Sequence, residues 1–493
     1  MSLKAGRLFL SRLRKANILT VHRNQSKLAS LHSDDVNYFI TTLGPQRVKQ
    51  DDLQSYNQDW LRLHSGQSKL VLFPGSTEDV SKILSYCDKK HLPLVVQAGN
   101  TSLVAGSVPD KDEIILSMGK MNKIEHFNDT TGVLQCESGC ILENLESFVQ
   151  ERGFIMPYDL GAKGSCQIGG NIASNAGGIR FIRYGSLHGS VLGLEVVLPS
   201  GKILNMMSSL RKDNTGYDLK QLFIGSEGTL GVVTKVSILC PVKPDHKIVT
   251  FLAVDQYTKI LDIMRSVRSE MSPYLSAFEM IDDETMDAVH TNLGLSIPFR
   301  SPFYVLFELS LSATCAEDRI EEQLHKMLEK YLDNGTITDG TISNDLTSLS
   351  KLWTIRERIA EALLADGKCF KYDVSLQHEH FYELVEVMRE RLKLADVKRV
   401  SGYGHIGDNN LHLGITCDRK KDSDEIKKLI EPFVFEWIRD RNGSISAEHG
   451  LGQTKRNHIH FSKSSDVVAI MKQVKNLFDP NGVLNPKKML PDD

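Results

Sequence analysis

The spacing of hydrophobic residues changes twice along the chain. Between residues 67 and 245, short apolar runs alternate with glycine-rich turns, a pattern typical of strands. These strands are predicted at residues 92–97, 113–116, 133–137 and 191–198. From about residue 247 the rhythm becomes strand, amphipathic helix, strand, with strands at 248–254, 275–281 and 303–309 and helices at 257–267 and 316–331. That alternation predicts an α+β domain in which helices cover one face of a sheet.

The flanking regions complete the expected organisation. With 493 residues, the chain is too long for one ordinary core, so two or three domains are expected. Residues 463–493 predict a closing helix, an Asp-Pro-Asn-Gly turn and a tail that returns to the first domain. We therefore divide the chain into a leader at 1–33, a helical segment at 34–66, a cofactor-binding domain at 67–245, a substrate domain at 246–462 and a C-terminal segment at 463–493.

Charge is unevenly distributed along the chain. Residues 1–33 hold seven Lys and Arg, no Asp or Glu, and several leucines. This composition predicts a mitochondrial transit peptide and a place in the mitochondrial matrix, with a disordered basic tail as the alternative. The rest of the chain holds 52 basic against 62 acidic residues, which does not favour nucleic acid as a partner. Apolar runs stay far shorter than the roughly 18 residues of a membrane span, so none is expected.

One motif invites a Rossmann interpretation. Residues 402–407 match GxGxxG, and an aspartate follows at position 422. A dinucleotide site needs a helix that begins at the third glycine, because the helix N-terminus holds the pyrophosphate. Residues 408–416 instead predict a turn that leads into a strand, so we reject this interpretation.

Two other segments are rich in glycine and small residues. The first, residues 95–106, directly follows a predicted strand, and the second spans residues 164–178. Closely spaced main-chain N–H groups in such turns can surround a pyrophosphate. For either segment alone, a structural set of turns is the simpler interpretation.

Both segments, with residues 225–234, resemble in order and spacing the FAD domain of the vanillyl-alcohol-oxidase-type flavoprotein family. The resemblance covers nearly all of the chain after residue 50. It implies a two-subdomain FAD-binding fold joined to an α+β substrate or cap domain, with FAD bound non-covalently. In that family the first loop carries the diphosphate, and the second lies along the ribityl chain and flavin ring. The implied FAD-binding residues are Gln97, Ala98, Gly99, Asn100, Thr101, Ser102, Leu103, Ala105, Gly106, Asp159, Leu160, Gly164, Ser165, Cys166, Gln167, Gly169, Gly170, Asn171, Ala173, Ser174, Gly177, Gly178, Tyr184, Gly231, Val232 and Val233.

The first loop departs from the family pattern at three positions. Family members usually carry glycine where this chain has Ala98, Ser102 and Ala105. A small side chain fits at such a position if its backbone φ is negative.

Candidate metal ligands lie in the second half of the chain. His405 and His412 are seven residues apart, and Gly407-Asp-Asn provides a turn that can place His405 in a loop and His412 on the next strand. Glu448 follows in Ser446-Ala-Glu-His-Gly. Two histidines and one glutamate form a ligand set of catalytic zinc, although a buried structural histidine and a surface Glu-His pair fit the spacing equally well. The eight cysteines show no paired metal-ligand spacing.

These two motifs resemble the D-2-hydroxyacid dehydrogenase branch of the same family. The resemblance implies that His405, His412 and Glu448 hold a divalent metal, with zinc the expected ion, and that His449 is the catalytic base. A 2-hydroxy acid would bind this metal through its C2 hydroxyl and carboxylate. The metal would lower the pKa of the hydroxyl, His449 would take the proton, and the C2 hydride would pass to flavin N5.

The resemblance also implies a substrate. In the 2-hydroxyglutarate members, the positions of Arg356 and Lys371 bind the distal carboxylate, and those of Asn410 and His449 also bind substrate. The expected reaction is oxidation of (R)-2-hydroxyglutarate to 2-oxoglutarate, with an electron-transfer flavoprotein as acceptor. Ala360 and Gly414 stand where the branch usually has a threonine and an asparagine near the substrate. The alternatives are a D-lactate dehydrogenase of the same branch and a non-catalytic flavoprotein with a decayed substrate site.

Overall fold

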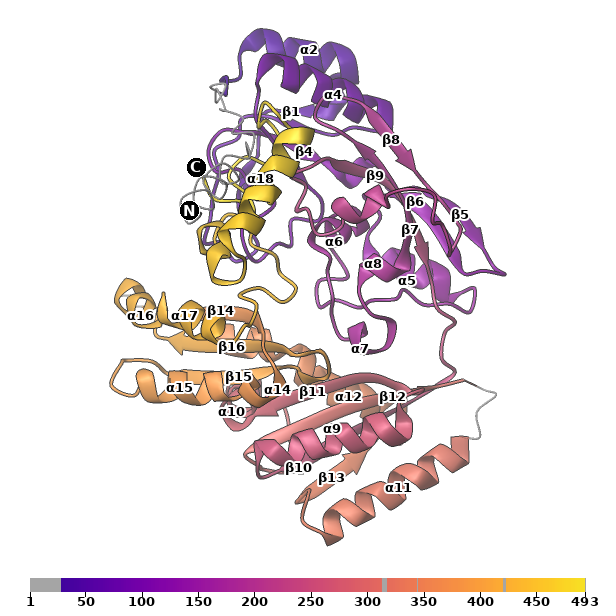
Figure 1. Ribbon diagram of the computed structural model, residues 1–493, viewed down its shortest axis with the longest axis vertical. Coiled ribbons are helices and arrows are strands. Elements are labelled where there is room, and N and C mark those ends of the chain that lie inside the picture. The colour runs from indigo at the N-terminus through magenta and orange to yellow at the C-terminus, as the bar shows by residue number, and fades with distance from the viewer. Residues whose placement is uncertain (1–27, 313–316, 344, 420–422, 493) are drawn as a thin grey trace, which may run out of the picture.

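The computed structural model describes residues 28–312, 317–343, 345–419 and 423–492. Most of the predicted transit peptide, residues 1–27, lies outside the described residues. Within the described residues the strands form three sheets, two in the N-terminal half and one in the C-terminal half. Figure 1 shows the N-terminal half above and the large C-terminal sheet below it.

The N-terminal half contains a four-stranded and a five-stranded sheet. The four-stranded sheet has the order β1-β2-β4-β3, with β1 antiparallel to β2 and the other pairs parallel. The five-stranded sheet is antiparallel, in the order β5-β6-β9-β7-β8. The strand bounds are β1 Val48–Lys49, β2 Val71–Leu72, β3 Leu94–Gln97, β4 Ile114–Ser117, β5 Ile124–Asn128, β6 Val133–Glu137, β7 Val191–Val197, β8 Ile203–Met206 and β9 Val232–Leu239.

Helices and 3-10 turns of this half pack on the sheets and connect them. The four-stranded sheet shares a core with α2 and α4, while α5 and α6 pack on the five-stranded sheet. The Ser76 side chain accepts a hydrogen bond from the backbone N–H of Asp79 and so caps the N-terminus of α4. The bounds are α2 Ser33–Leu43, η1 Pro45–Arg47, α3 Gln54–Asn57, α4 Thr77–Lys90, η2 Met118–Lys120, α5 Leu142–Gln150, α6 Ile168–Ser174, α7 Phe181–Tyr184, α8 Leu187–Ser190 and η3 Leu219–Leu222.

The C-terminal half is built on a seven-stranded antiparallel sheet in the order β13-β10-β12-β11-β15-β16-β14. Two of its inner strands are long: β10 and β12 pair with each other over nine residues. The bounds are β10 His246–Val254, β11 Leu275–Asp282, β12 Phe303–Leu311, β13 Asp339–Ile342, β14 Lys368–Ser375, β15 Arg399–His405 and β16 Asn410–Cys417. The strands predicted from hydrophobic spacing are confirmed, most with shifts of one or two residues at their ends.

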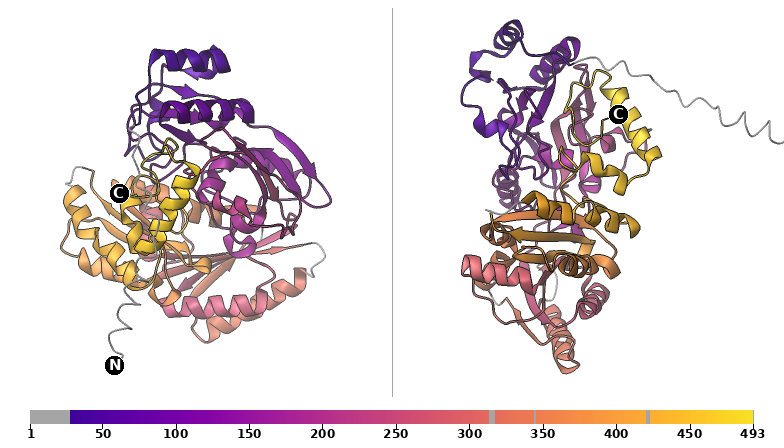
Figure 2. Two further views of the ribbon diagram at one scale, coloured as in Figure 1. Left: turned by 45° about the horizontal axis from the view of Figure 1, so that its top comes forward. Right: turned by 90° about the vertical axis from the view of Figure 1, so that its left-hand side faces the viewer.

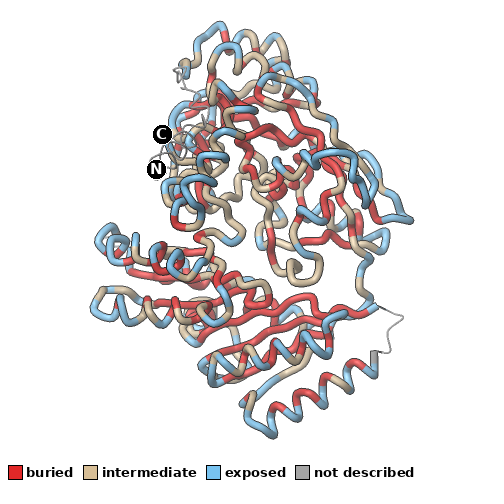
Figure 3. Tube along the Cα trace, viewed as in Figure 1, coloured by how far each residue is buried: buried red, intermediate tan, exposed pale blue. Residues whose placement is uncertain are grey.

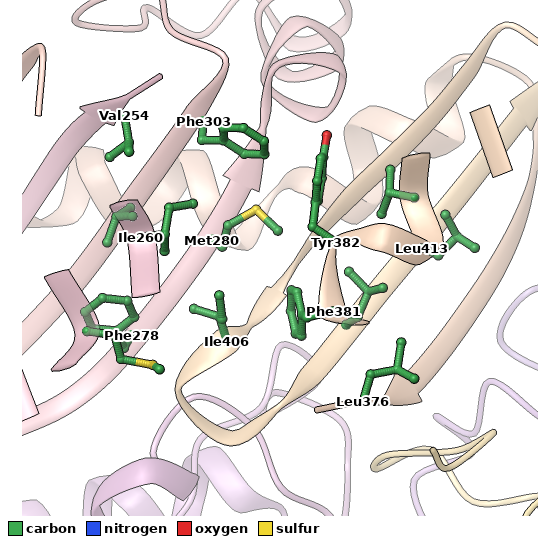
Figure 4. Packing of buried hydrophobic residues seen from close by; sticks show 14 of the residues in the cluster. Val254, Ile260, Phe278, Met280, Phe303, Leu376, Phe381, Tyr382, Ile406 and Leu413 are labelled. Carbon is green, nitrogen blue, oxygen red and sulfur yellow. The ribbon is translucent and has the colours of Figure 1, made fainter. Parts of the chain in front are cut away.

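Helices cover both faces of this sheet, so the prediction of one covered face is wrong. One core contains Phe278 and Phe307 with side chains of α9, α11, α15 and α17. Figure 4 shows part of this core, including Phe278 of β11 and Ile260 of α9. The opposite core contains Phe251 and Tyr304 with side chains of α10, α12 and α13. Strands β11 and β12 are buried at every position (Figure 3). The continuous apolar run in β12 was the sequence signal for two covered faces.

The helices of this half begin and end as follows: α9 Tyr257–Met271, α10 Asp283–Leu293, α11 Glu317–Asp333, α12 Leu346–Glu357, α13 Ile359–Ala365, α14 His378–Phe381, α15 Glu383–Arg391, η4 Ile406–Asp408, α16 Ser423–Ile430, α17 Phe433–Asp440 and η5 Arg456–Phe461. Asp282 caps α10 by accepting a hydrogen bond from the backbone N–H of Thr285 at 2.9 Å. No α-helix begins at Gly407, which agrees with the rejection of the Rossmann interpretation.

The C-terminal segment returns to the N-terminal half. Helix α18, Ser465–Phe478, lies beside that half in all three views (Figures 1 and 2). Phe478 packs against Phe223, and Leu484 bridges Leu94 of β3 in parallel. The predicted domain boundaries, including those at residues 245 and 462, stay a prediction.

Two features bear on the environment of the protein. Among the described residues, no helix is both long enough and apolar enough to cross a membrane. Seven cysteines lie in the described parts of the chain, and all seven are free thiols, six of them buried.

Candidate active site

A single cavity of about 810 Å³ runs between the glycine-rich loops of the N-terminal half and the seven-stranded sheet. It brings together most of the residues predicted for FAD, metal and substrate. The predicted residues that line it are Ala98, Gly99, Asn100, Thr101, Ser102, Leu103, Gly106, Asp159, Leu160, Cys166, Gln167, Gly169, Gly170, Asn171, Ala173, Ser174, Gly177, Gly178, Gly231, Val232, Val233, Arg356, Lys371, His405, His412, Glu448 and His449. Its volume is within the range of ligand sites in proteins.

Six predicted residues do not line the cavity: Gln97, Ala105, Gly164, Ser165, Tyr184 and Asn410. Gln97 is buried behind it, where its amide donates to the carbonyls of Tyr56 and Ser107 at 2.9 Å. The Asn410 amide is buried and donates to Asp373 Oδ1 at 2.7 Å. The prediction of Asn410 as a substrate contact stays a prediction.

The glycines allow the two loops to touch each other. A Cβ on Gly99 would lie 2.1 Å from the carbonyl oxygen of Ser165, and one on Gly178 would lie 2.0 Å from that of Asp159. Gly178 also has a φ of +79°, which disfavours other residues. The density of glycine therefore reflects backbone packed on backbone as well as an open surface for a cofactor.

Replacing Gly99 by alanine is expected to abolish stable FAD retention, because the new methyl group displaces the second loop. Gly161→Ala is the matched control, since it also lines the cavity and its Cβ would meet nothing within 4 Å. The flavin-to-protein absorbance ratio after gel filtration measures the effect. Equal flavin content in both variants would contradict this account of the cradle.

The condition of negative φ is met at two of the three unusual loop positions. Ala98 and Ser102 do not adopt positive φ, but Ala105 has a φ of +54°. A left-handed alanine costs on the order of 1 kcal/mol. The loop therefore keeps a glycine-like conformation at residue 105 without a glycine.

Two polar atoms of the cradle have no protein partner. Ser138 Oγ and Gln167 Oε1 are buried without a hydrogen bond, and both residues line the cavity. Buried polar atoms are nearly always hydrogen-bonded, so these two call for a polar ligand. The cradle thus has polar groups free for a ligand, as the predicted FAD site requires.

A tight β-hairpin places the two predicted metal histidines on one face. His405 is the last residue of β15, η4 makes the turn, and Asn410 begins β16 opposite His405. His412 is two residues further along β16, so it points to the same face as Asn410 and His405. His405 therefore lies at a strand end and not in the loop, and the odd spacing is absorbed by the turn.

Four side chains converge at this face. Glu448 Oε1 is 4.0 Å from His405 Nε2, 3.9 Å from His412 Nε2 and 3.6 Å from His449 Nε2. Ligand atoms bound to one tetrahedral zinc lie about 3.4 Å apart, so a small side-chain rotation brings the three predicted ligands into range. The donor set of two imidazoles and one carboxylate suits a divalent cation.

Asp373, which the sequence interpretation missed, supports this group from β14. It pairs with His412 across the strands, and its Oδ2 accepts the backbone N–H groups of Glu448 at 3.1 Å and His449 at 2.9 Å. Burial raises the pKa of Asp373, but the charges of His449 and His412 outweigh it and lower the pKa. Through these hydrogen bonds Asp373 orients the backbone of Glu448 and His449, and its carboxylate also lies close enough to Glu448 and His449 to form a second possible ligand group with them.

Two cationic side chains lie at the other end of this region. Arg356 is buried at the end of α12, and its Nη2 atom has no hydrogen-bond partner. Burial lowers the pKa of Lys371, and no hydrogen bond or ion pair of its ammonium group is found among the described residues. An arginine with a free N–H and a half-buried lysine without a partner suit a carboxylate.

The two unusual positions also line the cavity. Ala360 lies on α13, which follows α12 after a break at Arg358. A Cβ on Gly414 would lie 2.8 Å from Ser401 Oγ and 2.9 Å from Leu363 Cδ1. A larger residue at 414 would therefore require its neighbours to move, and neither position supplies a polar side chain to a ligand.

The loop that carries Glu448 is fastened to the N-terminal half. Glu448 Oε2 accepts the backbone N–H of Gly178 at 2.8 Å. The carboxylate of Glu227 accepts the backbone N–H groups of Leu451 and Gly452 at 2.8 and 2.7 Å. These charge-assisted hydrogen bonds therefore hold the loop against the N-terminal half beside the cavity.

Two family models match the chain. One, described as an FAD binding domain, matches residues 68–207, and the other, described as the C-terminal domain of FAD linked oxidases, matches residues 243–489. The two matched regions meet at the cavity.

Curated relatives match over nearly the whole chain. A zebrafish (Danio rerio) protein named mitochondrial D-2-hydroxyglutarate dehydrogenase is 50% identical over 93% of this chain and 86% of its own length. A Saccharomyces cerevisiae protein named D-2-hydroxyglutarate–pyruvate transhydrogenase is 42% identical over 93% of this chain and 95% of its own. Among solved structures, 4-ethylphenol oxidase from Gulosibacter chungangensis matches the fold with a TM-score of 0.73 at 18% identity, covering 94% of this chain and 99% of the oxidase.

Proposed function

This chain belongs to the family of FAD-linked oxidases that includes the D-2-hydroxyglutarate dehydrogenases, and from that premise we propose that it oxidises (R)-2-hydroxyglutarate to 2-oxoglutarate. It is an FAD-dependent dehydrogenase. The observation that carries the choice of substrate is the pair of Arg356 and Lys371. Both side chains line the same cavity as the histidine cluster. Among the described residues, neither the ammonium group of Lys371 nor the Nη2 atom of Arg356 has a hydrogen-bond partner.

We propose that His405, His412 and Glu448 hold a divalent cation, with zinc the expected ion. When bound, FAD supplies the hydride acceptor, and the cation supplies a Lewis acid beside the C2 hydroxyl. The 2-hydroxy acid end of the substrate belongs at this cluster. Its distal carboxylate belongs at Arg356 and Lys371, so the protein binds the two ends of the molecule with different chemistry.

The proposed base is His449. Its Nδ1 lies 3.4 Å from Asp373 Oδ2, and its Nε2 lies 3.6 Å from Glu448 Oε1 at the cluster. A carboxylate near Nδ1 favours the tautomer that keeps a proton there. That tautomer leaves the Nε2 lone pair free to take the proton of the C2 hydroxyl.

We place the enzyme in the mitochondrial matrix, with an electron-transfer flavoprotein as its acceptor. The acid-free, basic residues 1–33 support this location, as does the word mitochondrial in the zebrafish relative's name. The yeast relative's name couples the same substrate to pyruvate. A 2-oxo acid is therefore the acceptor to compare with the flavoprotein.

Anaerobic bleaching of the flavin tests this function. (R)-2-Hydroxyglutarate is expected to bleach the absorbance near 450 nm rapidly, and pretreatment with EDTA is expected to prevent this until zinc is restored. Bleaching by D-lactate alone would favour the D-lactate dehydrogenase alternative. A yellow protein that neither acid bleaches would favour a non-catalytic flavoprotein with a decayed substrate site.

A further inference from the structure

We infer that Glu279 is a positioning residue that fixes both ends of the substrate site at once. It lies on β11, and neither the sequence motifs nor the comparisons assign it a role. The inference rests on the proposed function, because it concerns how the proposed metal ligand His405 and the proposed carboxylate ligand Arg356 are held.

One carboxylate contacts both groups. Glu279 Oε1 lies 2.7 Å from His405 Nδ1, and Glu279 Oε2 accepts a hydrogen bond from Arg356 Nε at 2.7 Å. Glu279 is 1% exposed, so both bonds are shielded from water. A buried carboxylate that binds two cationic or polar donors in this way forms short, strong hydrogen bonds.

The first bond settles which nitrogen of His405 can bind a cation. An Nδ1–H that donates to Glu279 leaves the Nε2 lone pair directed at Glu448 Oε1, 4.0 Å away. A ligating histidine generally donates its other N–H to a carboxylate or carbonyl, which fixes the ring and strengthens the ligand. Glu279 is the carboxylate that contacts this second nitrogen of His405.

The second bond determines which N–H groups of Arg356 are left free for a substrate carboxylate. With Nε held by Glu279, and with the guanidinium 5.1 Å from the centre of the Tyr403 ring, the plane of the group is fixed. Its Nη2 atom is buried and has no partner. The free N–H groups are thereby presented to a carboxylate without a search among rotamers.

Glu279 therefore links the proposed metal ligand His405 to the proposed carboxylate ligand Arg356. If Glu279 is removed, the support of the metal ligand and the orientation of the arginine are lost together. A purely structural role in the sheet would instead lower stability and leave both properties unchanged.

The chain offers a matched control for this test. Glu308 lies on the neighbouring strand β12, is likewise a buried carboxylate, and binds Lys247, Ser276 and Trp353 away from the cavity. Glu279→Gln and Glu308→Gln thus remove the same charge from the same sheet. A glutamine at 279 has one oxygen, so it cannot accept from both donors.

The experiment measures the zinc affinity of flavin-loaded wild-type, Glu279→Gln and Glu308→Gln chains by competition with a chromophoric chelator. We expect Glu279→Gln to bind zinc about 10- to 100-fold more weakly and Glu308→Gln to match the wild type. The same Glu279→Gln chain, saturated with zinc, is expected to show a larger rise in KM for (R)-2-hydroxyglutarate than for D-lactate.

Unchanged zinc affinity in a folded Glu279→Gln chain would overturn the inference, as would equal losses in both variants. If Glu279→Gln does not fold, Glu279→Asp replaces it, because the shorter acid keeps the charge but cannot reach both partners. Zinc binding by the wild type separates this test from the proposed function. A wild-type chain that oxidises the substrate without binding zinc would refute the role at His405, and one that binds zinc but oxidises neither acid would refute only the proposed reaction.

Discussion

The His412→Ala chain is expected to lose its divalent metal and to oxidise (R)-2-hydroxyglutarate about 10³-fold more slowly than the wild type. The loss of one imidazole from the converging set leaves His405 and Glu448 as the remaining proposed ligands. Stabilisation of an alkoxide-like oxygen by a cation is worth several kcal/mol, which corresponds to about that change in rate. Turnover under steady-state conditions and metal content by mass spectrometry measure both effects.

The matched control is His290→Ala, a change on α10 whose imidazole bonds the backbone carbonyl of Leu295 at an exposed position. Flavin content of His290→Ala should equal that of the wild type, because His290 does not line the cavity. A His412→Ala chain that retains both metal and turnover would rule out the proposed ligand set.

The Arg356→Ala chain is expected to raise KM for (R)-2-hydroxyglutarate about 100-fold and KM for D-lactate less than about fivefold. The larger effect follows because a charge-assisted contact to the distal carboxylate is lost, and D-lactate has no distal carboxylate. The truncation also leaves the buried Glu279 without its partner at 2.7 Å. Initial rates with both acids, at saturating zinc, give the comparison.

Arg358→Ala is the control for this second prediction. Arg358 lies two residues away at the helix break, is partly exposed, and pairs with Glu361 at 2.7 Å outside the proposed contacts. It should leave KM for both acids unchanged. Equal increases for the two acids in Arg356→Ala would refute the dicarboxylate assignment and leave the general 2-hydroxy acid site intact.

Hydrophobic spacing was enough to predict seven of the strands and the helices α9 and α11. It did not predict that both faces of the large sheet are covered, because the position of helices around a sheet depends on long-range packing. The apolar residues at successive positions of β12 carried that information. Boundaries shifted by one or two residues at several element ends, where local capping decides the last turn or pair.

For the site, the sequence led to residues that share short motifs and missed those that arrive from distant strands. His405 and His412 are joined by one turn, so their shared face could be anticipated. Glu279 and Asp373 stand singly in strands, and a lone carboxylate in a strand has no spacing to interpret. The signal was present only as a charge inside an otherwise apolar run, which becomes informative once the register of β11 and β15 is known.

The hydrogen bonds from Gly178 to Glu448 and from Leu451 and Gly452 to Glu227 attach the loop that carries Glu448 to the N-terminal half. Anything that orders the glycine-rich loops also orders the loop that carries Glu448. For the proposed cation at Glu448, flavin binding and cation binding would therefore be linked equilibria, each favouring the other by the same free energy.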